Sequence, residues 1–171
     1  MDFNVRQKMI RIYQHGDHQS IAEIFARAVH EIGREVYSAE QCQAWSDPEP
    51  NPDHWLKRCE LKRPFVAVIG SQIAGFLELD TDGSIDCAYI NPDFKRQGIM
   101  TELVTYAIDV AFANNLPQLN VEASICAKPL FERLGFEVVS DEGVDISGIY
   151  LQNYRMQLTN TNAEQGVAPN P

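Results

Sequence analysis

One short segment combines residue types that could bind a phosphate group. Asn91-Pro92-Asp93 ends an apolar run, two cations follow at Lys95 and Arg96, and Gly98 opens an amphipathic run. The start of a helix presents unpaired backbone N–H groups and the positive end of the helix dipole, which suits a pyrophosphate. Gly98 lets the backbone approach an anion closely. An ordinary strand-to-helix turn with solvated cations is the alternative interpretation of the same residues.

The charge balance narrows the classes of partner. A formal net charge of −10 over 171 residues argues against a nucleic-acid partner, because neutralising phosphates requires a basic surface. The same charge is compatible with a cationic substrate such as an amine. No apolar run approaches the roughly 20 residues needed to span a bilayer, so a membrane is not expected as a partner. The four cysteines form no CxxC pair and no zinc-like cluster, which predicts reduced thiols, no metal and a cytoplasmic location.

Helices are expected to dominate the first third of the chain. Apolar residues recur with helical spacing from Ile21 to Ile32, and Asp17 or Ser20 could cap that helix. Ser38 and Gln41 fit the capping box of a second, short helix. A third short helix should follow the proline-rich loop.

The rest of the chain predicts an α/β fold, a mixed sheet of about seven mostly antiparallel strands flanked by helices. The unit 84–123 should form a parallel crossover through a helix that starts at residue 98. Residues 1–158 should form a single domain, and the polar tail 159–171 should be disordered. The expected strands are 8–13, 65–69, 73–79, 84–90, 119–123, 136–139 and 153–158.

The phosphate-binding candidate is similar to the acyl-CoA-binding motif of the GNAT-type N-acetyltransferases. That motif usually reads (Q/R)-x-x-G-x-(G/A) after a central strand, and the six positions here read Lys95-Arg96-Gln97-Gly98-Ile99-Met100. Gly98 matches, and Lys95 preserves a cation at the first position. Met100 departs further, since it brings a long side chain to a place where the backbone usually approaches the pyrophosphate.

A second stretch, VEASICAKPLFERLGFEVV, resembles the closing strand–helix–strand of the same family, N-x-x-A-x-x-x-Y-x-x-x-G-F. Ala127, Gly135 and Phe136 match this pattern. Ser124 stands at the Asn position and Phe131 at the Tyr position. In the family that Tyr commonly protonates the departing thiolate, which the side chain of Phe131 cannot do.

The N-terminal stretch AVHEIGREVYSAEQCQAW looks like the start of a small bacterial subgroup of GNAT enzymes, and the matches together cover roughly residues 8–158. The resemblance implies a GNAT-like fold and an N-acetyltransferase. Such an enzyme would move an acetyl group from acetyl-CoA to a primary amine of a small molecule or peptide, and the amine would attack directly in a ternary complex. The resemblance also implies acetyl-CoA as co-substrate and a possible homodimer.

The resemblance assigns residues to coenzyme A. In the family the central strand splays from its neighbour, and a freed backbone N–H near Ile90 can meet the thioester carbonyl. The turn and helix start after this strand would hold the pyrophosphate. The expected cofactor-binding residues are Ile90, Asn91, Lys95, Arg96, Gln97, Gly98, Met100, Thr101, Ser124 and Phe131.

Four residues are candidates for moving protons. Asp86 lies four residues before Ile90, on the same strand face by a period of two, and it is the first candidate for general base. Glu78 is the second candidate. Ser124 and Tyr89 could donate to the leaving thiolate, although a thiolate near neutral pH can leave without a dedicated acid. A solvated strand carboxylate is the alternative for Asp86.

The acceptor is expected beside the N-terminal helices. His30, Tyr37 and Trp45, with Tyr89, are the candidate substrate-binding residues, because aromatic walls suit a cation or a planar group. A structural role for His30 and a core position for Trp45 are the alternatives. Two other functions stay open: a non-catalytic acyl-CoA-binding or regulatory module, and a protein-interaction domain that has lost the cofactor.

Overall fold

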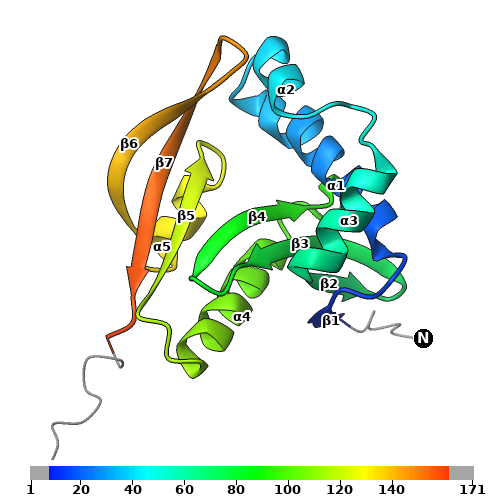
Figure 1. The fold of residues 1–171 in the computed structure, drawn as a ribbon. Helices are drawn as coiled ribbons and strands as arrows, with labels where there is room; N and C mark the ends of the chain where they lie inside the picture. Colours follow the sequence, from blue (N-terminus) through cyan, green and yellow to red (C-terminus); the bar gives the residue numbers. More distant parts are fainter. Residues whose placement is uncertain (1–7, 162–171) are drawn as a thin grey trace, which may run out of the picture.

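Seven strands form one mixed sheet in residues 8–161, the part of the chain that the computed structural model describes (Figure 1). The order across the sheet is β1-β2-β3-β4-β5-β7-β6, and only β4 and β5 run parallel. This confirms the predicted mixed fold and its parallel crossover. The strands are β1 (Lys8–Ile12), β2 (Phe65–Ile69), β3 (Gln72–Leu79), β4 (Ser84–Ile90), β5 (Gln118–Ser124), β6 (Glu137–Ile146) and β7 (Ile149–Thr159).

Helices cover both faces of this sheet. On one face α1 (Asp17–Arg27) and α3 (Pro52–Lys62) pack together over the β3 region, and α4 (Ile99–Ala113) covers the other face. The short helix α2 (Ala39–Trp45) packs against β7, and α5 (Lys128–Arg133) packs against β5. No helix within the described residues has the length and apolar character needed to cross a membrane.

The caps of the N-terminal helices match the prediction only in part. The capping box of α2 is confirmed, with Gln41 N donating to Ser38 Oγ and Ser38 N to Gln41 Oε1. The predicted cap of α1 is wrong, because Gly16 occupies that position with a φ of 102° and makes no side-chain cap. Asp17 instead pairs with Arg11 of β1 at 2.6 Å, so the carboxylate joins α1 to the edge strand. The ion pair therefore replaces the cap that the sequence suggested.

The helix predicted through Ile32 changes its winding after α1. Residues Ala28–Ile32 form a π-helix and Gly33–Glu35 a 3₁₀ turn. Hydrophobic spacing cannot reveal such a change, because a single wider turn shifts the apolar face by less than the pattern resolves. The π-helix brings Val29 and Ile32 to a cavity wall.

The hairpin of β6 and β7 is longer than predicted. Its strands meet at the turn Ser147–Gly148, where both residues have positive φ. Most of β6 is exposed to solvent, so its polar residues give no apolar alternation from which a strand could be predicted. The predicted disorder of the tail is wrong at its start: Thr159 ends β7, and Asn160 is buried and donates to Leu116 O. Residues 162–171 of the predicted tail lie outside the described part of the chain.

Two irregularities of β4 shape the centre of the sheet. First, β4 pairs with β5 at only two positions, Ser84 with Asn120 and Ile85 with Val121, and then the two strands diverge. Second, β4 carries a bulge: Leu77 faces Ala88 and Leu79 faces Ile85, so two β4 residues oppose one β3 residue. The divergence opens the sheet, and the bulge changes which face the following side chains occupy.

The bulge overturns one prediction about Asp86. In a regular strand Asp86 and Ile90 would share a face. Ile90 instead packs with the core cluster under α4, whereas Asp86 contacts Arg58 and Lys62 of α3 on the opposite face. The prediction of a common face is therefore wrong, because a single extra residue reverses the alternation.

Candidate active site

Two cavities meet where β4 leaves β5. A cavity of about 560 Å³ lies between Tyr37 and Trp45 of the α2 region, strand β4 and the β5–β7–β6 half of the sheet. A smaller one of about 180 Å³ lies between the π-helix region and the start of α4. Trp45, Tyr89 and Ser124 line both cavities, so these three residues mark the junction. Tyr89 and Ser124, two of the four residues predicted to move protons, therefore both border this junction.

The start of α4 fits an anion. Gly98 is the N-cap with a φ of 76°, and a Cβ placed there would meet no atom within 4 Å, so the space beside it is open. The first helical bond runs from Glu102 N to Gly98 O. The amides of the residues between them, Ile99, Met100 and Thr101, therefore have no partner within the helix. This is the arrangement that can hold a pyrophosphate.

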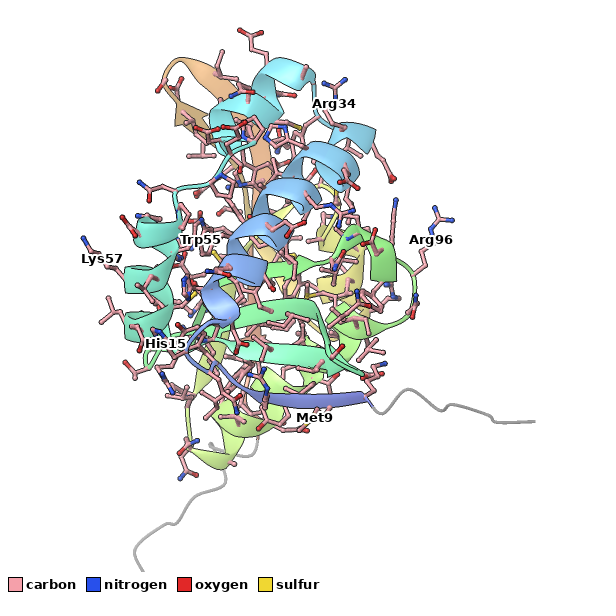
Figure 2. All side chains as sticks on the ribbon, turned by 90° about the vertical axis from the view of Figure 1, so that its right-hand side faces the viewer. Met9, His15, Arg34, Trp55, Lys57 and Arg96 are labelled. Carbon is pink, nitrogen blue, oxygen red and sulfur yellow. The ribbon has the colours of Figure 1, made fainter. Side chains whose placement is uncertain are left out.

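The side chains around this turn differ in their placement. Lys95 lines the smaller cavity and forms an ion pair with Glu35. Arg96 has a φ of 63° and projects away from the molecule (Figure 2). Met100 packs partly against the core under α4 and forms part of the smaller cavity's wall. Gln97 lines a separate cavity of about 400 Å³ beside β1 and β3. Only Lys95 among the cations therefore reaches the smaller cavity.

Two of the expected cofactor-binding residues have side chains with structural contacts. The amide oxygen of Asn91 accepts from Asp93 N at 3.0 Å and from Arg27 at 3.2 Å, which fixes the turn after β4. Phe131 is 1% exposed and packs edge-on against Phe136 with ring centroids 5.0 Å apart. Asn91 and Phe131 line neither junction cavity, so other residues would have to contact a cofactor that occupied these cavities.

Ile90 and Thr101 complete the predicted cofactor set. Ile90 lines the smaller cavity at the end of β4, opposite Gly75 of β3. Thr101 is exposed in the first turn of α4, and its carbonyl accepts from Thr105 Oγ1 at 2.7 Å. Ile90 thus borders the cavity, and the backbone amide of Thr101 has no partner within the helix at its start.

Tyr89 lies in an aromatic cluster. Its ring centroid is 4.9 Å from Phe25 of α1, 6.3 Å from Trp45 of α2 and 5.9 Å from Phe76 of β3. Desolvation raises the pKa of the Tyr89 phenol well above its ordinary value, although a side-chain hydrogen bond with Trp45 opposes the shift. The phenol is therefore neutral at physiological pH and can donate a hydrogen bond at the junction.

Ser124 and Tyr37 form the opposite side of the junction. Ser124 Oγ accepts from Ala127 N at 3.2 Å, which ties the hydroxyl to the loop before α5. The Tyr37 hydroxyl donates to Gln152 O at 2.8 Å and accepts from Ile125 N at 2.9 Å. Tyr37 is 5% exposed, lines the larger cavity and joins the N-terminal region to β5 and β7. It is both a wall of that cavity and a structural tie.

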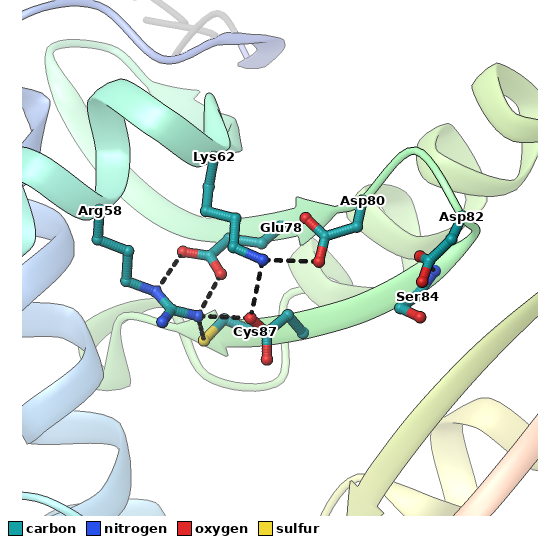
Figure 3. A network of polar contacts seen from close by, with 8 residues as sticks. Arg58, Lys62, Glu78, Asp80, Asp82, Ser84 and Cys87 are labelled. Carbon is teal, nitrogen blue, oxygen red and sulfur yellow. Dashed lines mark hydrogen bonds and ion pairs between the residues drawn. The ribbon is translucent and has the colours of Figure 1, made fainter.

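The two base candidates occupy different environments, and Figure 3 shows Glu78 facing the guanidinium of Arg58. Asp86 lines the larger cavity, and its Oδ2 lies 2.8 Å from Arg58 and 3.2 Å from Lys62. Glu78 is 0% exposed, and its two oxygens accept from Arg58 Nε and Nη2 at 2.8 and 2.6 Å. Glu78 lines neither junction cavity. The geometry favours Asp86 over Glu78 as the carboxylate that meets an acceptor.

The remaining acceptor candidates separate in the same way. Trp45 lines both cavities and meets Tyr37 edge-on at 5.4 Å between ring centroids. His30 lines neither of them, and its Nε2 lies 2.7 Å from Ser46 O, which fixes the end of α2. The structural alternative for His30 matches this contact.

Several polar residues that line the larger cavity are not among the site residues predicted from the sequence. They come from the ends of β3 and β4 and from facing positions of β5 and β7, such as Glu122 and Arg155, which are paired in register. Alternation along β5 could have indicated Glu122, since it shares a face with Ser124. Nothing local could have indicated the β7 residues, because a cross-strand neighbour depends on register. The set is Asp80, Ser84, Asn120, Glu122, Gln152, Asn153 and Arg155.

Comparison with known proteins agrees with this geometry. Residues 34–158 match the family model described as an acetyltransferase (GNAT) domain. The uncharacterized N-acetyltransferase YafP of Escherichia coli is 33% identical over 148 residues, which cover 86% of this chain and 93% of the relative. The peptidyl-lysine N-acetyltransferase YjaB of Salmonella typhimurium is 27% identical over 144 residues, which cover 81% of this chain and 90% of the relative.

Solved structures share the fold. A GCN5-related N-acetyltransferase from Rhodopseudomonas palustris superposes with a TM-score of 0.83 at 24% identity, covering 94% of this chain and all (100%) of the other. The putative acetyltransferase yncA of Salmonella typhimurium, solved with acetyl-CoA, superposes with a TM-score of 0.69 at 19% identity, covering 96% and 98%. With the matching family model and the YafP relative, the chain belongs to the GNAT family and is an acyl-CoA-dependent acetyltransferase.

Proposed function

We propose that this protein transfers the acetyl group of acetyl-CoA to a primary amine of a small molecule or peptide, by direct attack in a ternary complex. The observation that carries the proposal is the junction at Trp45, Tyr89 and Ser124. One cavity leads to it from the start of α4, and the other leads to it from a polar groove. Two substrates that enter from opposite sides can therefore react at one point without a covalent enzyme intermediate.

The start of α4 would hold the cofactor. Acetyl-CoA supplies an activated acetyl thioester when bound. The amides of Ile99, Met100 and Thr101 would bind its pyrophosphate, and Gly98 leaves the backbone open to it. Lys95 adds a positive charge at the wall of the smaller cavity. The divergence of β4 from β5 releases backbone N–H groups before Ile90, and one of them would polarise the thioester carbonyl.

The larger cavity would hold the amine. Asp80, Asp86 and Glu122 line it, so its carboxylates attract an ammonium group. Asp86 would accept the ammonium proton directly or through a water molecule. Arg58 and Lys62 bind the same carboxylate, so the ammonium group would compete with them for it. Glu122, which the structure adds to this cavity, is a further candidate for the general base, because it lies two residues before Ser124 on the same strand face.

Tyr89 would stabilise the departing sulfur. Its raised pKa keeps the phenol protonated, and it is then a weaker acid than a thiol with a pKa of about 8.5. Full proton transfer from the phenol to the thiolate is therefore uphill, and we assign Tyr89 the role of hydrogen-bond donor to the sulfur. Ser124 lies beside it at the junction and is a second donor.

A cytoplasmic location completes the proposal. All four cysteines are free thiols, and Cys42 and Cys59 are buried without partners in disulfides. Free thiols in a chain with this many cysteines are typical of a reducing compartment.

Release of free thiol from acetyl-CoA across a panel of amines tests the function. The panel should include spermine and a lysine peptide, because a solved spermidine N-acetyltransferase of Vibrio cholerae was crystallised with CoA and spermine and YjaB is a peptidyl-lysine enzyme. We expect thiol release that depends on one class of amine. Binding of acetyl-CoA without release for any amine would indicate a non-catalytic module, and no binding at all would leave an interaction domain.

A further inference from the structure

The bulge of β4 decides where Tyr89 points. Ile85 packs in the cluster under α4, and in a regular strand Tyr89, four residues later, would point to the same side. Tyr89 instead packs with α1 and α3 in the opposite cluster. The extra residue at Asp86 and Cys87 accounts for this reversal, since both residues oppose the single Glu78. Without the bulge the phenol would face α4 and leave the junction of the two cavities.

One side chain contacts every residue of this bulge. The guanidinium of Arg58, from α3, donates to both oxygens of Glu78 at 2.8 and 2.6 Å. Its Nη2 also lies 2.8 Å from Asp86 Oδ2 and 3.3 Å from Cys87 Sγ (Figure 3). The planar fork of arginine can satisfy several acceptors at fixed angles, which a lysine ammonium cannot do in the same way. Arg58 thus joins the three members of the bulge to one helix.

The neighbouring cation has a narrower role. Lys62, one helical turn after Arg58, contacts Asp80 at 2.6 Å and Asp86 at 3.2 Å. Its hydrogen-bond and ion-pair partners among the described residues include neither Glu78 nor Cys87. The charged groups facing Asp86 are therefore Arg58 and Lys62, but only Arg58 reaches the β3 side of the bulge.

We propose that Arg58 is a positioning residue for acetyl transfer: by holding Glu78, Asp86 and Cys87 together, it fixes the β4 bulge that turns Tyr89 toward the junction. The proposal rests on the proposed function, because the importance of Tyr89 there depends on it. Arg58 lines neither junction cavity, but it borders a third cavity of about 400 Å³ together with Asp86 and Tyr89. We assign it an action through the strand because its hydrogen bonds go to the bulge residues.

A double variant, Arg58→Met with Glu78→Met, tests the proposal. Removing Arg58 alone leaves a buried carboxylate unpaired, whereas apolar replacement of both members of a buried ion pair is often tolerated. We expect kcat to fall about 100-fold, as for a misplacement of about 1 Å, with KM for acetyl-CoA within about twofold. The nuclear Overhauser contact between the rings of Phe25 and Tyr89, whose centroids lie 4.9 Å apart, should disappear.

Two further variants accompany it. Lys57→Met, on the same helix with its side chain directed outward (Figure 2), should keep both kcat and the ring contact. Arg58→Lys keeps a charge beside Glu78 and guards against failure of the double variant to fold. It should give a loss of kcat between the wild type and the double variant, because an ammonium group cannot hold all three bulge residues.

The outcomes separate the two proposals. Retention of the Phe25–Tyr89 contact in the folded variants overturns the role of Arg58, and so does loss of that contact with unchanged kcat. Loss of both supports it. Should the wild type transfer no acetyl group to any amine, the proposed function fails, and the ring contact alone then decides whether Arg58 sets the bulge.

Discussion

At the scale of single residues, the chemistry depends on side chains whose surroundings differ from those that the sequence suggests. Desolvation raises the pKa of the Tyr89 phenol further above the physiological range, and the neutral phenol can donate a hydrogen bond at the junction. The family motif places a Tyr where this chain has Phe131, and that ring is buried in the core. In the proposed function, a hydroxyl from a different element, β4, would take the place near the sulfur.

Replacing Tyr89 by Phe should lower kcat about 100-fold, the size typical of removing one hydrogen-bond donor to a developing negative charge, and leave the affinity for acetyl-CoA unchanged. Steady-state kinetics with a saturating amine measures the first quantity, and calorimetry with acetyl-CoA measures the second. Tyr106→Phe, at the partly exposed surface of α4, is the matched control. A kcat for Tyr89→Phe that equals the control would remove the phenol from the mechanism.

A second tyrosine gives a prediction about pH. Burial, aided by a hydrogen bond to Glu60, raises the pKa of Tyr13 from 10.0 to about 12. A raised pKa in the folded state means that stability is complete below pH 10 and decreases as the pH rises through about 12, because the unfolded phenol loses its proton first. In Tyr13→Phe the free energy of unfolding should fall less steeply across this window. Denaturation curves at a series of pH values would expose an error if both proteins lost stability equally.

At the scale of elements, strand β4 and the helix that follows it carry the site. Gly98→Val puts a β-branched residue at a φ of 76°, which such residues rarely adopt, so the helix start should shift. We expect the dissociation constant for acetyl-CoA to rise at least about tenfold, since that costs only about 1.4 kcal/mol of binding. Calorimetry measures it.

The control for this variant is another glycine with a similar backbone. Gly70 has a φ of 64° in the turn between β2 and β3 and lines none of the described cavities near α4. Gly70→Val should cost stability but leave the dissociation constant unchanged. Equal affinity in the Gly98 and Gly70 variants would contradict pyrophosphate binding at the start of α4.

The elements that sequence periodicity could predict are those with one buried face. The strands of the meander and the helix after Gly98 were predicted nearly to their ends, because alternation and helical spacing record burial directly. The bulge at Asp86 and Cys87 could not be predicted, since both residues suit an ordinary strand and the bulge depends on Arg58. The half of the β6–β7 hairpin next to its turn could not be predicted for a related reason, because most side chains of β6 are exposed and show no apolar alternation.

At the scale of the whole molecule, the N-terminal helices and the C-terminal hairpin must be held at a fixed distance for the larger cavity to exist. Tyr37 makes that connection through one hydroxyl, which contacts both Gln152 O and Ile125 N. The sequence indicated Tyr37 as a substrate contact, and only the fold reveals the tie. Candidate site residues could be proposed from the sequence where a motif resembles the family pattern. Those that depend on contacts between distant segments could not.

Tyr37→Phe should lower the free energy of unfolding by about 1 kcal/mol, because it leaves the part-buried Ile125 N–H without its acceptor. KM for the amine should rise as the cavity loses its fixed width, and KM for acetyl-CoA should change less. Chemical denaturation and steady-state kinetics provide these values. Tyr150→Phe, whose hydroxyl contacts Gln152 from an exposed position, is the control, and equal stability of the two variants would contradict this role.

The central claim is that one cavity brings a cofactor from the start of α4 to the junction beside Ser124. Amide chemical shifts of the isotope-labelled protein during a titration with coenzyme A test it directly. We predict the largest shifts at Gly98, Ile99 and Met100, with smaller ones at Ser124 and almost none at Arg155, across the larger cavity. Saturable binding that leaves the amides of residues 98–101 unmoved would contradict the account.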